Sequence, residues 1–336
     1  IENLPLILGK TQPHDLLFLL QNPHELRPTG GFIGTIGNLT LANGQLQEFY
    51  TDDVYNIDVH ALGREELIAP QAIQDYTEVE YWYLRDANWY PDFPTSAKQV
   101  IDLYQHEVQD ARVDSIIAVT PYAIQEFLKL TGPIEVDNIV FTSENLIDAI
   151  QFRVEQEFWR IGLSEEDRKI VINHLAQALK QRLFNLNSDE VKAVIDIFLS
   201  SLDRKEILLY TSFPSVQDYF VQQDWAGEIK PFEGDFLAVF DANLGALKTD
   251  RVVDRSREYN VTREEDGRYK AELKIAYKNN GFFDYRTTRY RTYTRVYVPL
   301  GSELISSTGF VKADKSRRYV DPEVYSEFNK TVFAGF

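Results

Sequence analysis

Two short segments of the chain combine arginine with glycine or carboxylate side chains, a combination suited to recognising an anion. In the first segment, Arg27 and Thr29 directly precede Gly30 and Gly31. Glycine allows a backbone to approach a ligand closely, and a guanidinium group presents planar, permanently charged donors to carboxylate or phosphate. We interpret this segment as one wall of an anion-binding cleft. The alternative is a tight connection between strands with a surface arginine.

The second segment starts with Arg85 and Asp86 and continues through Asn88 into an aromatic stretch with two prolines. Prolines at this spacing exclude regular secondary structure, so we predict a loop. Arg85 and Asp86 are either part of a ligand site or a salt-bridged pair that makes the loop rigid. Two further carboxylates, Asp52 and Asp53, are adjacent in the chain and form either another part of the site or a solvated turn.

The composition excludes several classes of protein. The chain of 336 residues has no cysteine, which rules out disulfides and thiol chemistry, and its five histidines lack the spacing of a zinc site. The formal net charge of −17 is uneven, because residues 248–318 hold 17 Lys and Arg against 10 Asp and Glu. The acidic remainder argues against nucleic-acid binding. The basic segment faces either an anionic partner or the acidic body of its own chain.

Strands and helices are expected to alternate in the first part of the chain. The pattern predicts strands at residues 15–20, 113–120, 134–140 and 206–211, a hairpin at 32–49 that turns at Asn43-Gly44, and helices at 64–77, 97–108, 121–130 and 216–223. Thr95 or Ser96 is the expected cap of the helix at 97–108. Loops at the carboxyl ends of strands in such a core are the usual place for a ligand.

The rest of the chain is expected to form a helical block and a β module. Residues 142–205 are predicted to be helical, with starts near Ser143 and Ser164 and a last helix at 191–202. Alternating strands are predicted at residues 235–240, 257–263, 269–279, 290–299 and 303–309. We therefore predict the α/β class, with a layered α/β/α domain at 1–230 followed by an antiparallel β module at 231–336.

Several motifs resemble a bacterial family known as domain of unknown function 4012. They are RPTGGFIG at 27–34, RDANWYPDFP at 85–94, VDSIIAV at 113–119, TGPI at 131–134, DANLGALKT at 241–249 and YRTYTRVYVP at 290–299. The resemblance spans most of residues 15–310, and the two segments that contain Arg27 and Arg85 are its most specific parts.

That family is distantly similar to the LytR-CpsA-Psr (LCP) proteins, membrane-anchored phosphotransferases that act outside the cytoplasm. They move a glycan phosphate from a polyprenyl pyrophosphate carrier onto the cell wall. The likeness implies an LCP-like core with a mixed central sheet. Two departures stand out. LCP enzymes carry an Arg-Ser-Asp-Thr loop whose Asp binds magnesium, whereas this chain has Thr29 and Gly30 at the last two positions. Their next motif is Pro-Arg-Asp, whereas this chain has Thr51, Asp52 and Asp53.

The likeness implies a role for each candidate residue. Phosphoryl transfer requires neutralisation of the phosphate charge and alignment of the acceptor hydroxyl, so Arg27 and Arg85 would clamp phosphate. The further substrate contacts would be Thr29, Gly30, Gly31, Asn88 and Lys248, and the candidates for catalytic base and for ligand of Mg²⁺ or another divalent cation are Asp52, Asp53 and Asp86. We expect Arg27, Arg85 and at least one of these carboxylates to converge on one cleft.

We therefore predict an extracytoplasmic LCP-like protein of the bacterial cell envelope. It would bind a polyprenyl-pyrophosphate-linked glycan and, in the stronger form of the hypothesis, transfer it to a cell-wall or envelope acceptor. Its partners would be the lipid-linked glycan or a wall polymer, and the membrane through an N-terminal anchor outside this sequence. The alternative is a non-catalytic envelope module that binds glycan or protein through a degenerate cleft. The missing Asp of the Arg-Ser-Asp-Thr loop favours this alternative, and the retained arginines favour the enzyme.

Overall fold

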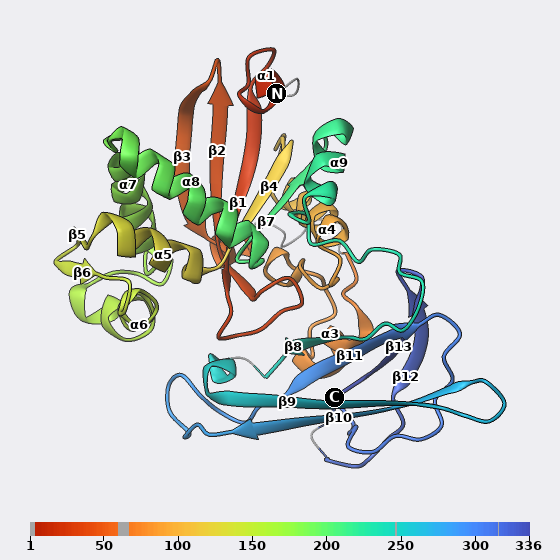
Figure 1. The fold of residues 1–336 in the computed structure, drawn as a ribbon. Coiled ribbons are helices and arrows are strands. Elements are labelled where there is room, and N and C mark those ends of the chain that lie inside the picture. The colour runs from red at the N-terminus through yellow and green to blue at the C-terminus, as the bar shows by residue number, and fades with distance from the viewer. Residues whose placement is uncertain (1–3, 60–66, 246, 315) are drawn as a thin grey trace.

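A computed structural model describes residues 4–59, 67–245, 247–314 and 316–336, and a five-stranded mixed sheet forms the centre of its first part (Figure 1). The strand order is β3-β2-β1-β4-β7. Strands β1 and β4 run parallel, and every other neighbouring pair is antiparallel. The strands are β1 (His14–Asn22), β2 (Phe32–Ala42), β3 (Gln45–Asp53), β4 (Ser115–Val119) and β7 (Ile207–Thr211).

Helices cover both faces of this sheet because its central strands are apolar on both sides. In β1, Leu17 and Leu19 pack in one apolar cluster and Phe18 in another, as expected when successive side chains point to opposite faces. Helix α4 (Phe93–Glu107) covers the first face, and helices α5 (Pro121–Thr131) and α8 (Ser188–Asp203) cover the second (Figure 1). The predicted layered α/β/α class is confirmed.

The hairpin between β2 and β3 turns where the sequence predicts. Asn43 and Gly44 have φ values of 54° and 74°, the positive pair that a two-residue type I′ turn requires. The hairpin continues to Asp53, four residues beyond the predicted end. Asp52 and Asp53 therefore belong to β3 and do not lie in a turn after it.

Several predicted boundaries were wrong. Helix α4 begins at Phe93 and not at residue 97, because Asp92 and not Thr95 or Ser96 is its cap. In the helical block, α6 (Leu146–Phe152) and α7 (Ile170–Phe184) begin after Asn145 and Lys169 rather than at Ser143 and Ser164. The predicted helix at 64–77 is observed as α3 (Gln71–Thr77), and residues 60–66 lie outside the described part.

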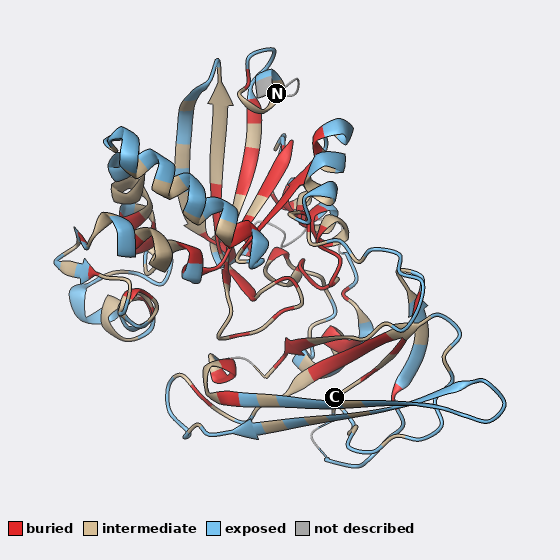
Figure 2. Cartoon of the chain, in the orientation of Figure 1, coloured by how far each residue is buried: buried red, intermediate tan, exposed pale blue. Residues whose placement is uncertain are grey.

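Two β structures make up the C-terminal part. A four-stranded sheet has the order β12-β13-β11-β8, and a separate hairpin is formed by two long strands. The strands are β8 (Ala238–Asn243), β9 (Val253–Arg263), β10 (Tyr269–Asn279), β11 (Thr292–Pro299), β12 (Glu323–Glu327) and β13 (Lys330–Gly335). The last two strands were missed, and the predicted strand at 303–309 is irregular and pairs with no described strand. Most of the hairpin is exposed, whereas its first residue, Val253, is buried (Figure 2).

The two parts of the chain share an apolar cluster. Trp89 stacks on Tyr293 of β11 at 5.5 Å between ring centroids, and Ile73 of α3 lies in the same cluster. Arg295 of β11 is 1% exposed, and its guanidinium carbon lies 4.4 Å from the ring centroid of Trp89. The second predicted loop therefore packs against the β module. The predicted domain boundary at residue 230 stays a prediction.

We expect Asp92 to contribute more to stability than an ordinary helix cap. Its carboxylate accepts from the Thr95 backbone N–H at 3.0 Å and from the Ile229 N–H at 2.9 Å. Asp92 therefore joins α4 to the segment around Ile229 that leads to the β module. Asp92→Ala should lower the free energy of unfolding by about 2–3 kcal/mol in chemical denaturation. Asn187→Ala, which removes only the exposed cap of α8, should cost about 1 kcal/mol. Equal losses would contradict this account.

Candidate functional site

An ion-pair chain joins the two segments in which the sequence predicts a site. Arg27 lies in the loop that follows β1, and Arg85 and Asp86 lie in the 3₁₀ turn η2 (Leu84–Asp86). The Asp86 carboxylate accepts from Arg27 Nη2 at 3.0 Å and lies 3.8 Å from Arg85 Nε. The structure thus brings Arg27, Arg85 and one of the three predicted carboxylates together, at the carboxyl end of β1.

Arg27 is held on all sides. Its side chain is 6% exposed, and besides Asp86 it donates to the backbone oxygens of Leu26 and of Asn243 in β8, the latter at 2.6 Å. A buried guanidinium with every nitrogen paired is a structural anchor. The role that we infer for Arg27 is therefore to hold Asp86 in place, while direct contact with a ligand stays a prediction.

The four uncharged candidates form the framework of the loop. Asn88 is 1% exposed and donates to Thr29 Oγ1 at 2.9 Å and to the Gly31 backbone oxygen at 2.8 Å. Gly31 has a φ of 154°, and a Cβ there would lie 2.2 Å from the Asn22 oxygen. The bonds from Asn88 to Thr29 and Gly31 hold the loop against the second segment, while the Gly30 N–H donates to the Arg27 oxygen within the loop. A ligand role for these four residues stays a prediction.

Arg85 is the better exposed of the two arginines. Its Nη1 donates to Asp58 at 2.6 Å, its side chain is 20% exposed, and its guanidinium carbon lies 4.1 Å from the ring centroid of Tyr83. Among the described residues, no hydrogen bond is formed by its Nη2. Arg85 can therefore donate to an anion through Nη2 while its Nη1 stays bonded to Asp58.

Asp52 and Asp53 point to opposite faces of β3, as successive strand residues do. Asp53 is 2% exposed; it pairs with Lys169 at 2.7 Å and Arg168 at 3.2 Å, and it caps the short helix α2 (Val54–Asp58). Asp52 instead accepts from Asn56 at 2.7 Å. Of this carboxylate pair, only Asp53 takes part in the ion pairs of the site.

Five cations surround two aromatic rings at this end of the sheet. The rings of Phe32 and Tyr55 lie 6.3 Å apart. Arg27 and Lys248 lie 5.3 and 5.6 Å from the Phe32 centroid, and Arg85, Arg168 and Lys169 lie 5.3, 5.6 and 5.7 Å from that of Tyr55. We call these five residues the basic cluster. Such ring contacts are attractive because the face of an aromatic ring carries partial negative charge.

Arg27, Arg85 and Lys248 of the basic cluster were predicted from the sequence, whereas Arg168 and Lys169 were missed. These two adjacent cations follow an acidic run in the helical block, far along the chain from the other three. Two adjacent basic residues after an acidic run were the local feature from which these site residues could have been predicted. Tyr55, Glu25 and Asp58 were missed as well, and only the fold brings them to the site.

Four carboxylates balance the five cations. Glu25 pairs with Lys248 at 2.7 Å. The other three carboxylates are Asp53, which pairs with Lys169, Asp58, which pairs with Arg85, and Asp86, which pairs with Arg27. Burial lowers the pKa of Lys169, and Arg168 and Lys248 lower it further against the opposing effect of Asp53. Crowded like charges of this kind favour the arrival of an anion.

A small cavity opens beside two members of the basic cluster, Arg27 and Arg85, whereas Arg168, Lys169 and Lys248 do not line it. Its volume is about 210 Å³, and its lining includes Glu25, Arg27, Tyr55, Arg85 and Asp86. Pockets that enclose a whole small molecule usually measure about 300–1,000 Å³. The cavity therefore has the size of one charged group of a larger ligand.

The carboxylates present do not make a ready site for a divalent cation. Mg²⁺ favours oxygen ligands that are free to coordinate, whereas Asp53 and Asp86 each accept from basic side chains and Asp52 lies on the other face of β3. Among the described residues, no group of three or more His, Asp and Glu side chains is placed to hold a metal ion. The arrangement thus disagrees with a site built from these three residues, and Mg²⁺ dependence stays a prediction.

A family model agrees with the first part of the chain. Residues 11–154 match the family described as "Protein of unknown function (DUF4012)", which confirms the predicted resemblance over these residues. They contain both predicted segments and every candidate site residue except Lys248. A comparison with curated proteins finds no match.

Solved structures with a similar arrangement share little sequence with this chain. The Lin1025 protein from Listeria innocua is 10% identical with a TM-score of 0.35, and the match covers 78% of this chain and 90% of that one. The gbs0355 protein from Streptococcus agalactiae is 12% identical with a TM-score of 0.37, covering 66% and 77%. B. subtilis TagV is 14% identical with a TM-score of 0.35, covering 68% and 88%.

A buried carboxyl pair beneath Arg85 should make the stability of the protein depend on pH. Asp58 and Glu107 both accept from the Leu84 N–H, at 3.0 and 3.3 Å, and Glu107 is 1% exposed. Burial raises the pKa of Glu107, and the neighbouring Asp58 raises it further. A carboxyl group with a raised pKa stabilises the fold while it is protonated, and this stabilisation is lost as pH rises from the ordinary value through the raised one.

Glu107→Gln keeps the acceptor for Leu84 but cannot ionise. Relative to the variant, the wild-type protein should therefore lose stability between about pH 4.5 and neutral pH, by on the order of 2 kcal/mol. Chemical denaturation across this range measures the difference. Glu48→Gln, at an exposed position of β3, should show no such trend. A difference between wild type and Glu107→Gln that does not change with pH would contradict the assignment.

Proposed function

We propose that the basic cluster binds the phosphate or pyrophosphate group of a polyprenyl-linked glycan of the bacterial cell envelope. The observation that carries the proposal is the convergence of Arg85, Arg168, Lys169 and Lys248 beside Tyr55, with side chains between 12% and 20% exposed. Partly exposed cations can bind an anion, whereas fully enclosed ones cannot reach it. Charge-assisted hydrogen bonds from such groups are the strongest contacts that a phosphate can receive.

The size of the cavity supports a headgroup and not a whole lipid. One phosphate fits in about 210 Å³, so the polyprenyl chain and the glycan lie outside it. The half-exposed ring of Tyr55, 43% exposed at the mouth of the site, offers a flat surface against which a sugar or an isoprene unit packs. The resemblance to LCP proteins makes a lipid-linked glycan the preferred ligand class.

Transfer of the glycan is the stronger form of the proposal. An acceptor hydroxyl needs a base, and Asp86 is the carboxylate nearest to both arginines. Its engagement by Arg27 favours the second candidate function, an envelope module that binds the anion without catalysis, because Asp86 Oδ1 already accepts from Arg27 and is occupied when an acceptor hydroxyl arrives. The two functions share the binding step and differ in turnover.

The proposed location is the outer side of the cytoplasmic membrane. This location follows from the resemblance to envelope proteins. None of the described helices is long and apolar enough to cross a bilayer.

Two variants test the binding step and leave each buried carboxylate with one basic partner. Arg168→Gln leaves Asp53 paired with Lys169, and Lys248→Gln leaves Glu25 beside Arg27 at 3.6 Å. Each should weaken binding of a short-chain polyprenyl pyrophosphate about tenfold in isothermal titration calorimetry, because each removes one charged contact. Arg112→Gln is the matched control, since Arg112 pairs with Asp114 at the opposite end of the sheet. Equal affinities in all three variants would contradict the proposal.

Turnover separates the two candidate functions. If the chain is a transferase, release of polyprenyl phosphate from a lipid-linked glycan should occur in the presence of an acceptor and Mg²⁺, and Asp86→Asn should lower its rate at least about a hundredfold. If it is a binding module, no release should occur while the affinity for the lipid persists. Release at the same rate in wild type and Asp86→Asn would exclude Asp86 as the base.

A further inference from the structure

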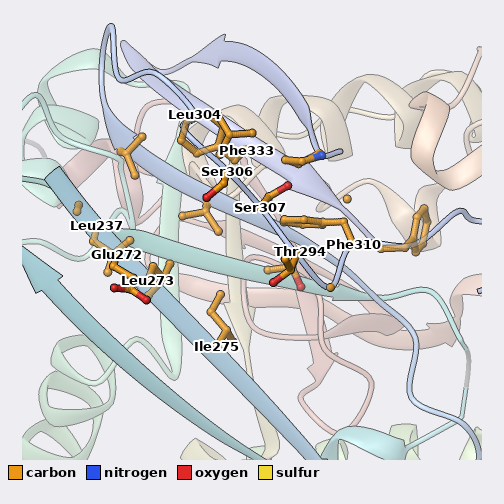
Figure 3. Close-up of a pocket in the computed structure, with 18 of the residues that line it drawn as sticks. Leu237, Glu272, Leu273, Ile275, Thr294, Leu304, Ser306, Ser307, Phe310 and Phe333 are labelled. Carbon is orange, nitrogen blue, oxygen red and sulfur yellow. The ribbon is translucent and has the colours of Figure 1, made fainter. Parts of the chain in front are cut away.

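A second and larger cavity lies in the β module, away from the basic cluster. It has a volume of about 1710 Å³ and runs between the β9–β10 hairpin and the four-stranded sheet. Figure 3 shows its walls: Leu273 and Ile275 of β10 on one side, Leu304 and Ser306 on the other, and Thr294 of β11 between them. We call this cavity the module groove.

The module groove is mostly apolar and accessible. Its apolar lining includes Leu237, Val261, Leu273, Ile275, Val296 and Phe333. Val261 is 44% exposed and Ile305 is 75% exposed. An isolated two-stranded hairpin is only marginally stable in water, so exposed apolar side chains on β9 and β10 mark a face that a further element can cover.

Both walls of the module groove offer unpaired backbone. Consecutive residues 269–273 of β10 line it, and because successive strand residues point to opposite faces, the groove reaches the edge of the strand as well as its face. Among the described residues, β10 pairs only with β9, so its other edge is open. Residues 303–309 line the opposite wall, and within the described part of the chain their backbone N–H and C=O groups form no hydrogen bonds.

A strand was predicted in this second wall, yet no described strand pairs with it. An open edge beside an apolar floor is the arrangement to which an added strand binds, because the backbone supplies hydrogen bonds and alternate side chains fill the groove. We propose that the module groove binds an extended peptide segment of another protein, which pairs with the open edge of β10.

Charge sets the expected composition of this segment. Lys270, Arg289, Arg291, Lys312 and Arg317 line the groove against Asp235, Glu272 and Glu303. Arg291 lies 5.3 Å from the ring of Tyr76, which stacks on Phe336, and the Val311 N–H donates to the Phe336 oxygen. Arg291 and Lys312 therefore mark one end of the groove. The bound segment carries apolar side chains at alternate positions and an acidic side chain or its carboxyl terminus at that end.

A peptide fits these walls better than a lipid chain does. A hydrocarbon chain would remove the unpaired backbone groups of both walls from water without replacing their hydrogen bonds, which costs free energy for each group. The buried hydroxyl of Ser307 also lacks a partner within the described residues. A peptide backbone supplies both donors and acceptors to these groups.

Selection of a displayed library of random twelve-residue peptides on the whole chain tests the proposal. The enriched peptides should alternate apolar and polar residues and contain an acidic residue near one end. In fluorescence anisotropy, Leu273→Asp should weaken binding of the best peptide at least about tenfold. Lys274→Asp should leave binding unchanged, because Lys274 is the next residue of β10 but does not line the groove. Leu304→Asp, on the opposite and partly exposed wall, provides a second variant if Leu273→Asp fails to fold.

A second peptide separates strand pairing from apolar contact alone. The same sequence with alternate backbone amides N-methylated should bind at least about tenfold more weakly, since it cannot donate to β10. The proposal is overturned if no peptide is enriched, if the groove variants bind as the wild type does, or if N-methylation has no effect. Displacement of the peptide by undecanoic acid at equal concentration would overturn it in favour of a lipid site.

Discussion

The ion pair between Arg27 and Asp86 is the interaction on which the rest of the site depends. It joins the loop after β1 to η2, and the further bond from Arg27 to the Asn243 oxygen carries the same connection into β8. Removing Asp86 would leave the buried Arg27 guanidinium with Glu25, at 3.6 Å, as its remaining carboxylate, and a buried charge that loses its main partner is costly. The pair fixes the loop after β1 against η2, and it adds to the apolar contacts between the two parts of the chain.

This arrangement divides the charged residues into two groups. Arg27, Asp53 and Asp58 are buried, and each is paired: Arg27 with Asp86, Asp53 with Lys169 and Arg168, and Asp58 with Arg85. Arg85, Arg168, Lys169 and Lys248 lie around them and remain partly open to solvent. A site of this kind keeps its shape before a ligand arrives, because the inner charges fix the outer ones. Such preorganisation reduces the entropy that binding must overcome.

The sequence predicts the parts of the fold that local chemistry determines. The apolar runs of β1 and β4, the Asn43-Gly44 turn and the first segment each carry a local pattern, and the structure contains them. Asp92 was missed as the cap of α4 although its signal is local, since Asp is a preferred cap and Pro94 stands in the first turn; the two prolines led to the prediction of a loop there. Arg168 and Lys169 were missed because only the packing of the helical block against β3 brings them to Asp53. The strand predicted at 303–309 does not form, because its apolar residues Leu304 and Ile305 are adjacent rather than alternating and the described chain places no pairing neighbour there.

The claim that the basic cluster is a phosphate site is tested most directly by a crystal structure of the whole chain with inorganic pyrophosphate. The account predicts a bound anion beside Tyr55, within hydrogen-bond distance of Arg85 and of at least one of Lys169 and Arg168, while the pair of Arg27 and Asp86 stays intact. An anion bound at another surface, or a basic cluster that stays without one at saturating pyrophosphate, would contradict it.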